Sequence, residues 1–178
     1  LMRAMLLLPA LLLTAAPLAA CSVDGDDGGT GVPAAGTGTA RTFAVADFTG
    51  VALRGSDDVD VRVGPGFSVR AEGPSAELDK LKIERVGDTL RVGRKRNSGF
   101  SWGGHHQGVK VFVTMPRIVA AQIAGSGNLA IDRVAGGDFA GDSAGSGNLS
   151  IAQLTVPRAK LSVAGSGDIA VKGAVDRL

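Results

Sequence analysis

The segment Gly93–Gly108, GRKRNSGFSWGGHHQG, gathers cationic, aromatic and imidazole side chains that could bind a ligand. Cations beside an aromatic ring suit acidic or neutral glycans, or lipid headgroups. The adjacent histidines could hold a transition metal, but no cysteine, third histidine or well-placed carboxylate accompanies them, so we predict no metal site. The alternative to ligand contact is a long exposed hairpin loop between two strands. The candidate ligand residues are Arg94, Lys95, Arg96, Trp102, His105 and His106.

A serine in the second half of the chain matches a catalytic signature. The sequence GDSAG at Gly141–Gly145 fits the G-x-S-x-G nucleophile elbow of α/β hydrolases. That elbow needs a strand–turn–helix context and a histidine later in the chain, yet both histidines precede Ser143. The recurring Gly-Ser-Gly segments do not form a phosphate loop, because no Lys-Ser/Thr pair follows them. We therefore predict no catalytic residue and no cofactor.

Cys21 points to export and lipidation. Arg3, the apolar run Met5–Leu13 and the ending Leu18–Cys21 are typical of a secretory signal over residues 1–20. The ending LAAC resembles the lipobox of bacterial lipoproteins, whose cysteine becomes the first mature residue and carries the lipid. By the same resemblance, Ser22 in place of aspartate implies retention at the outer membrane, facing the periplasm or the cell surface. The alternative is a plain signal peptide with a chance cysteine.

The residues after Cys21 and the overall charge limit the possible partners. Residues 21–40 are rich in Gly, Ala, Thr and Asp and predict a flexible tether. Asp24–Gly29 resembles half of a calcium loop but lacks the glutamate that would close it. The net charge is +2, and the chain has one Trp and no Tyr, so the composition argues against a nucleic-acid partner.

Residues 41–178 predict a single all-β domain that begins with strands of period two at residues 41–116. Asp58–Val63 and Phe67–Ala71 flank a Gly-Pro-Gly turn and predict a hairpin. Leu81–Gly93 predicts two strands around a Gly-Asp turn, and Gly108–Pro116 predicts another strand. Between them, Ser75–Leu81 predicts one short helical turn that Ser75 caps.

From residue 120 to residue 178 the pentapeptide AGSGN or AGSGD recurs with a period of 20 residues. Aliphatic residues fall into columns on this period. The columns are Leu129, Leu149 and Ile169, and Ile131, Ile151 and Val171, while Ile123, Ser143 and Val163 share a third. A fixed period with aliphatic columns is typical of a solenoid. This part therefore predicts a β-solenoid of rungs stacked about 4.8 Å apart.

The glycines of the repeat predict sharp corners between two short strands. Such corners need positive φ, which glycine adopts freely and Asn and Asp tolerate best among the other residues. Stacked copies would also place the Asn and Asp side chains in a hydrogen-bonded ladder, and the serine hydroxyls in another. The corner residues are Gly125, Gly127, Asn128, Gly145, Gly147, Asn148, Gly165, Gly167 and Asp168.

The reiterated Gly-Ser-Gly-Asn/Asp followed by alternating aliphatics resembles the auto-transporter adhesin "head GIN" domain family of bacterial envelope proteins. The resemblance covers Phe43–Leu178, and GSDDVDV within Phe43–Gly64 looks like a degenerate first copy of the repeat. It implies a β-solenoid-like fold and a place outside the cytoplasm. It supplies no activity and no catalytic residues.

These observations predict a non-enzymatic envelope lipoprotein that presents its β surface for adhesion or envelope interaction. Its expected partners are the membrane, through the lipid, and a glycan or another envelope protein. The alternatives are a carbohydrate-binding module and, less in keeping with the sequence, a polysaccharide lyase or hydrolase, which would want clustered carboxylates. Ala174, Val175 and Leu178 continue the apolar pattern without a capping repeat. That end predicts a truncated C-terminus or, alternatively, an open rung for self-association.

Overall fold

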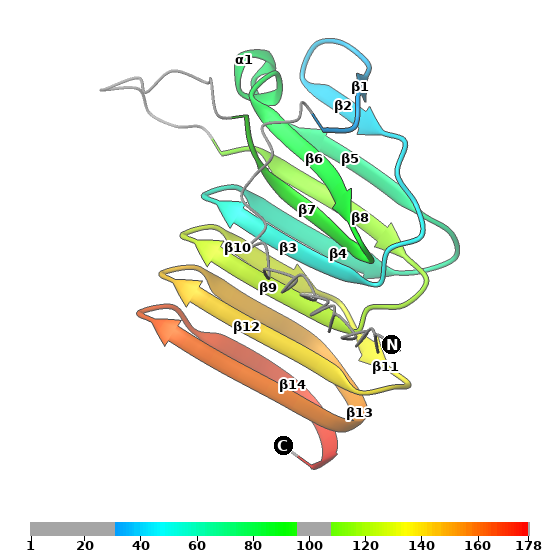
Figure 1. Ribbon diagram of the computed structural model, residues 1–178, viewed down its shortest axis with the longest axis vertical. Helices are drawn as coiled ribbons and strands as arrows, with labels where there is room; N and C mark the ends of the chain where they lie inside the picture. Colours follow the sequence, from blue (N-terminus) through cyan, green and yellow to red (C-terminus); the bar gives the residue numbers. More distant parts are fainter. Residues whose placement is uncertain (1–30, 96–107, 178) are drawn as a thin grey trace, which may run out of the picture.

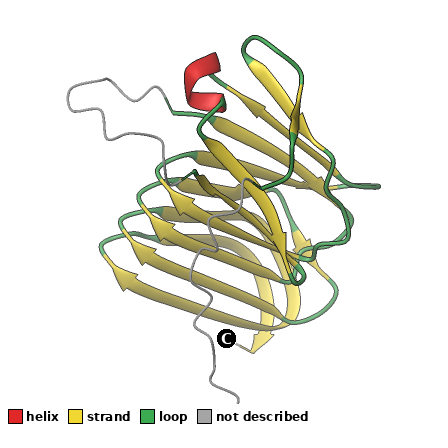
Figure 2. Ribbon diagram, turned by 45° about the horizontal axis from the view of Figure 1, so that its top comes forward, coloured by secondary structure: helices red, strands yellow, loops and turns green. Residues whose placement is uncertain are grey.

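A computed structural model describes residues 31–95 and 108–177 (Figure 1). In these ranges the chain is all-β, as predicted, with one short helix, α1 (Ser75–Leu78). Figure 2 shows the strands curling into half of a barrel. The strands are β1 (Ala34–Ala35), β2 (Ala40–Phe43), β3 (Gly50–Gly55), β4 (Asp58–Val63), β5 (Ser68–Glu72), β6 (Leu81–Val86), β7 (Thr89–Arg94), β8 (Lys110–Met115), β9 (Ala120–Gly125), β10 (Asn128–Ile131), β11 (Val134–Ala135), β12 (Phe139–Gly145), β13 (Asn148–Gly165) and β14 (Ile169–Arg177).

The strands form one 14-stranded sheet in the order β1-β2-β5-β8-β4-β10-β13-β12-β9-β3-β7-β6, with β11 and β14 paired to β13 off this path. The first part of β13 pairs with β10 and its last part with β12, so this strand joins the two sides of the curl. We call the side made of β6, β7, β3, β9, β12 and the end of β13 the β3 side. The opposite side, with β5, β8, β4, β10, the start of β13 and β14, is the β4 side (Figure 1).

The repeats lie in parallel one above another, in the register that the sequence columns predict. Leu129 pairs with Leu149 and Ile131 with Ile151, and Ile169 and Val171 follow in β14. On the β3 side, Ser143 lies between Ile123 and Val163. The predicted columns are therefore confirmed as neighbouring positions of the sheet.

One of the two predicted hairpins is wrong. β8 lies between β4 and β5, parallel to the first and antiparallel to the second. Alternation with period two identifies the side chains that face the core, but it does not identify the neighbouring strand. In β8, Val111 and Val113 are almost fully buried in the core. The hairpin of β6 and β7 is confirmed.

The fold begins before residue 41, so the predicted tether is too long. β1 pairs with β2, and the Val32 N–H donates a hydrogen bond to the Ile83 carbonyl at 2.7 Å. The predicted cap of the helical turn is also wrong, because Pro74 occupies the N-cap position of α1 and makes no side-chain cap. The Ser75 hydroxyl instead accepts a hydrogen bond from Arg41 at 3.2 Å.

The aliphatic columns face one another across the curl and form a single core. Burial decreases at the last copy of the repeat. Ile123 is 2% exposed, whereas Val163 in the same column is 48% exposed. In β14, Ile169, Val171 and Val175 are only partly buried against the core.

Candidate functional site

The first glycine of each repeat turns the corner. Gly125, Gly145 and Gly165 have φ of 138°, 112° and 130°, a region that favours glycine. The carbonyls of Gly125 and Gly145 also each accept hydrogen bonds from two amides of the next copy. The Gly125 carbonyl, for example, accepts hydrogen bonds from the amides of Ser146 and Gly147, both at 3.0 Å.

The second glycine of each repeat is required for a different reason. We predicted positive φ here and at the following Asn or Asp, but Gly127, Gly147, Gly167 and those residues are absent from the left-handed region. A Cβ on Gly147 would instead meet the Gly127 carbonyl oxygen at 2.4 Å and the Ile123 side chain at 2.7 Å. The positive-φ prediction is therefore wrong at these positions, where close stacking of two backbones excludes a side chain.

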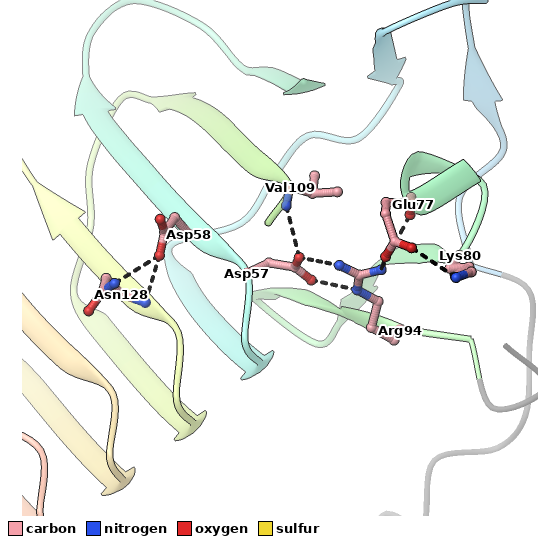
Figure 3. Close-up of polar contacts among 7 residues, drawn as sticks. All are labelled: Asp57, Asp58, Glu77, Lys80, Arg94, Val109 and Asn128. Carbon is pink, nitrogen blue, oxygen red and sulfur yellow. Dashed lines mark hydrogen bonds and ion pairs between the residues drawn. The ribbon is translucent and has the colours of Figure 1, made fainter. Parts of the chain in front are cut away.

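The predicted ladder of polar side chains is present and starts one copy earlier. The Asn128 amide donates to Asp58 at 2.9 Å (Figure 3), and the Asn148 amide donates to Asn128 at 3.1 Å. The Asn148 oxygen then accepts the Asp168 backbone N–H at 3.1 Å. Within residues 31–95 and 108–177, no hydrogen bond joins the hydroxyls of Ser126, Ser146 and Ser166 to one another. The ladder is therefore made by the Asn and Asp residues alone.

Arg94, a candidate ligand residue, is engaged inside the fold. Its Nε donates to Asp57 Oδ2 at 2.8 Å and its Nη2 donates to Asp57 Oδ1, while Nη1 donates to Glu77 Oε2 at 2.6 Å (Figure 3). Asp57 is 1% exposed and also accepts the Val109 N–H at 3.2 Å. Lys80 binds the other oxygen of Glu77 at 2.9 Å. Arg94 thus connects the first corner, β7 and α1.

These contacts shift two ionisation equilibria. Hydrogen bonds from Lys80 and then from Arg94 hold the pKa of Glu77 below its ordinary value. The hydrogen bond to Asp57 raises the pKa of Arg94 above its ordinary value, against the opposing effect of burial. Both shifts favour the charged forms, so these contacts stabilise Glu77 as a carboxylate and Arg94 as a guanidinium cation.

Of the remaining candidate ligand residues, only Lys95 lies within the described part of the chain. Lys95 follows β7, and its ammonium donates to the Asp79 carbonyl at 2.8 Å. Arg96, Trp102, His105 and His106, like Cys21, lie outside the described residues. Among the residues that the structure describes, no group of His, Cys, Asp and Glu could hold a metal ion.

Ser143 is no nucleophile elbow. It lies within strand β12, is 2% exposed, and its hydroxyl donates to the Gly147 carbonyl at 3.0 Å. An elbow would place this hydroxyl at a strand–helix turn beside a histidine. The hydroxyl instead satisfies its hydrogen bond inside the core, in the column of Ile123 and Val163.

A cationic hollow lies on the outer face of the β3 side, and Arg94 is the one lining residue that the sequence analysis had named as a candidate. We call it the Gly93 hollow. Its cavity volume is about 340 Å³, at the lower end of the range for ligand sites. Its lining includes Arg54, Lys82, Glu84, Arg91, Gly93 and Arg94. Alternation places Arg54, Lys82 and Arg91 on outward faces, but only the pairing of β3 with β7, distant in sequence, brings them together.

Comparison with solved structures finds the same fold in bacterial proteins. A putative adhesin from Parabacteroides distasonis matches with a TM-score of 0.58 at 16% identity, over 77% of this chain and 66% of that one. A putative lipid binding protein from the same species matches with a TM-score of 0.56 at 19% identity, over 76% of this chain. The chain thus spans about 66% of the length of each. No curated protein matches it.

Those identities show the fold alone, and the family comes from the sequence itself. The family described as "Putative auto-transporter adhesin, head GIN domain" matches residues 47–178, which begin before the degenerate first copy and include every later repeat. This confirms the resemblance found in the repeats, and no enzyme role is indicated for the family. The chain belongs to the head GIN domain family of auto-transporter adhesin-like proteins.

Proposed function

We propose that the protein is a non-enzymatic cell-envelope lipoprotein whose curled sheet presents a surface for adhesion or for contact with other envelope components. The observation that carries this proposal is the ordered outer face of the β3 side. There the parallel register aligns the outward residues Ala124, Ala144 and Ala164 in one row. A flat row of small side chains on a rigid sheet can approach another surface closely. Membership of an adhesin-like family supports the same function.

A matched pair of substitutions tests which face makes the contact. Ala144→Arg adds a long cation to the exposed row on the β3 side, and Ala152→Arg adds the same side chain at an exposed position of the β4 side. Cells that carry the full chain are scored for attachment to one another and to surfaces coated with envelope extract. We expect Ala144→Arg to reduce attachment and Ala152→Arg to leave it unchanged. Equal attachment of cells with and without the protein would overturn the proposal.

We propose that Cys21 carries a lipid that holds the protein at the outer membrane. The support is the sequence LAAC, and family membership suggests an envelope or surface location. Cys21→Ser should release the protein from sedimented membranes, and mass spectrometry of the parent should find an acylated N-terminal cysteine. An unmodified, soluble parent protein would contradict the anchor. If the parent is acylated, proteinase treatment of intact cells shows whether it faces the periplasm or the cell surface.

We also propose that the repeats belong to a β-solenoid. The parallel pairing of Asn128–Ile131 with Asn148–Ile151, and of the latter with β14, supports it, because solenoids stack equivalent residues in this way. A regular stack places one adhesion-face residue per strand. The face would therefore suit an extended partner better than a compact one.

The alternative function is a carbohydrate-binding module, which the Gly93 hollow favours. A glycan array probed with the full chain and with Trp102→Ala tests whether the segment after β7 takes part. Loss of glycan binding in Trp102→Ala supports that segment as part of the module. Binding to no glycan in the parent rules the alternative out.

A further inference from the structure

The Gly93 hollow has a floor of bare backbone between cationic walls. Gly93 pairs with Lys82 across the β6–β7 hairpin, and its missing Cβ would lie 3.3 Å from the Arg54 carbonyl oxygen and 3.7 Å from the Arg54 Cβ. Arg91 lies two residues along the same outward face, opposite Glu84. A side chain at position 93 would fill this space. The glycine therefore leaves room for a group that approaches the backbone among the cationic side chains of the hollow, of which Arg94 is already bound by Asp57 and Glu77.

The charges of the hollow are arranged to take a further anion. Lys82 and Arg91 both contact the Glu84 carboxylate, at 3.1 Å and 3.3 Å. Arg91 uses one terminal nitrogen in that contact, which leaves other guanidinium donors for a ligand. Arg54 is exposed and makes no ion pair within residues 31–95 and 108–177. The Arg54 and Arg91 guanidinium groups thus border the glycine floor with donors suited to an oxyanion.

The surface next to the hollow is shaped for a polymer that carries hydroxyl groups. Arg54 pairs with Ala124, so the row of Ala124, Ala144 and Ala164 continues from the hollow across successive strands. A second row runs parallel to it, beginning at the buried Ala52 and continuing with polar residues. These polar residues are Gln122, Asp142 and Ser162. Adjacent strands lie about 4.8 Å apart, close to the length of one sugar residue in an extended polysaccharide.

We propose that the Gly93 hollow binds the oxyanion of an acidic polysaccharide, with the sugar chain lying along the alanine row and its hydroxyls meeting the polar row. This inference rests on the proposed function, since it names the ligand class of the same outer face. A lipid headgroup fits less well, because large apolar side chains are absent from both rows of this face. On the β4 side, the groove that includes Arg62 and Lys172 is also lined by Asp60 and Asp132, whose charges oppose an anion.

Binding of the full chain to a uronate polymer, polygalacturonate, tests the proposal, with dextran sulfate as the sulfate counterpart and dextran as the neutral control. We expect binding to one or both acidic polymers and none to dextran, with an affinity that falls as salt rises. Arg54→Gln and Arg91→Gln should each weaken binding by about tenfold or more, the usual effect of removing a charge-assisted hydrogen bond. Arg62→Gln, which removes an equal charge from the β4 side, should change it less than about twofold.

Gly93→Ser separates a site from a general effect of charge. It keeps every cation and fills the floor, and position 93 has no left-handed φ that would strain a serine. We expect it to weaken binding as much as Arg54→Gln when binding is measured well below the unfolding midpoint of the variant, since its Cβ lies 3.3 Å from the Arg54 carbonyl oxygen. Full binding by Gly93→Ser, or equal losses in Arg54→Gln and Arg62→Gln, would overturn the hollow as the site. No binding of the parent to either acidic polymer would overturn the ligand class.

The cell-attachment assay keeps the two proposals distinguishable. If Arg54→Gln cells attach like the parent while Ala144→Arg cells do not, the adhesion face stands and the acidic ligand is wrong. If the purified chain binds polygalacturonate through Arg54 but cells with and without the protein attach equally, the hollow stands and the adhesive function is wrong.

Discussion

The first copy of the repeat and the three later copies differ at one telling position. The first copy reads Gly-Ser-Asp-Asp at residues 55–58, whereas the later copies read Gly-Ser-Gly-Asn or Gly-Ser-Gly-Asp. All four begin with a glycine at positive φ, and all four end in a residue of the polar ladder. The third position separates the first copy from all the later ones, with Asp57 in the place of Gly127, Gly147 and Gly167.

The direction of the missing Cβ explains this difference. A Cβ on Gly127 would meet the Asp57 carbonyl at 2.0 Å, and one on Gly167 would meet the Gly147 carbonyl at 2.0 Å, so each points at the preceding copy. At the first copy the equivalent direction leads to Arg94 and Val109 instead (Figure 3). The third-position glycine is thus required in the later copies, where the backbone of the preceding copy lies against it. In the first copy no preceding copy lies there, and Asp57 forms an ion pair with Arg94 instead.

The largest effect is expected from adding a methyl group at a stacked glycine. Gly147→Ala forces its Cβ against the Gly127 carbonyl and the Ile123 side chain, both within 2.7 Å, so the stack must separate. We expect the free energy of unfolding to fall by about 3 kcal/mol or more, at the upper end for overpacked cores. Urea unfolding measures it. Gly136→Ala is the control, since that glycine has φ of 100° but open space around it. A smaller loss in Gly147→Ala than in Gly136→Ala would contradict the contact argument.

The next effect comes from making the first copy identical to the others. Asp57→Gly removes the carboxylate that binds Arg94 and the Val109 N–H, and no backbone moves in to take its place. We expect a loss of about 2–3 kcal/mol, less than for a fully buried pair because Arg94 is 24% exposed and keeps Glu77. In the Arg94→Met background, Asp57→Gly should lower the free energy of unfolding by less than it does in the parent. Additive losses in this double-mutant cycle would show that the pair is not coupled.

The same comparison shows what the sequence could reveal. A period of 20 residues fixed the register of the aliphatic columns, because stacking places identical positions side by side. The repeat period did not distinguish the glycine that adopts positive φ from the glycine that allows two backbones to lie close together, since both occur in the same Gly-Ser-Gly segment. Alternation in β4 and β5 gave the inward residues but the wrong neighbour, because β8 returns from far along the chain.

The candidate sites divide along the same line. The ladder could be predicted because its members share one column of the repeat. The Gly93 hollow could not, because Arg54 and Arg91 are 37 positions apart and meet only through the β3–β7 pairing. Arg94 looked like a ligand residue because it begins a basic run, yet the carboxylate that binds it, Asp57, lies in the first corner. The local sequence shows where charged residues occur, but the pairing of distant strands determines which groups they contact.

A smaller effect is expected in the ladder, where the copies are most alike. Asn148→Ala removes the bond to Asn128 and leaves the Asp168 N–H to water. Because these groups are exposed, we expect a loss of about 1 kcal/mol, seen as a lower thermal midpoint. Ser146→Ala, at an exposed position of the same corner, should change the midpoint less. Equal shifts would mean that the ladder adds nothing to the stack.

The smallest effect concerns acid and is confined to the first-copy end of the molecule. The pKa of Glu77 is lower in the folded chain than in the unfolded chain, so the unfolded chain binds more protons as the solution becomes acidic. The stabilisation by Glu77 is therefore present above the ordinary glutamate pKa of about 4.3 and is lost as pH falls through the folded value. We expect the unfolding midpoints of the parent and Glu77→Gln to differ at pH 7 and to converge at lower pH. Glu72→Gln, in the exposed pair with Arg70, is the control and should have little effect at either pH.

Gly147→Ala should instead lose the same stability at both pH values relative to the parent, because its cost is steric. A pH-dependent loss in Gly147→Ala, or a constant gap between the parent and Glu77→Gln, would mean that the two ends are not held by these different forces.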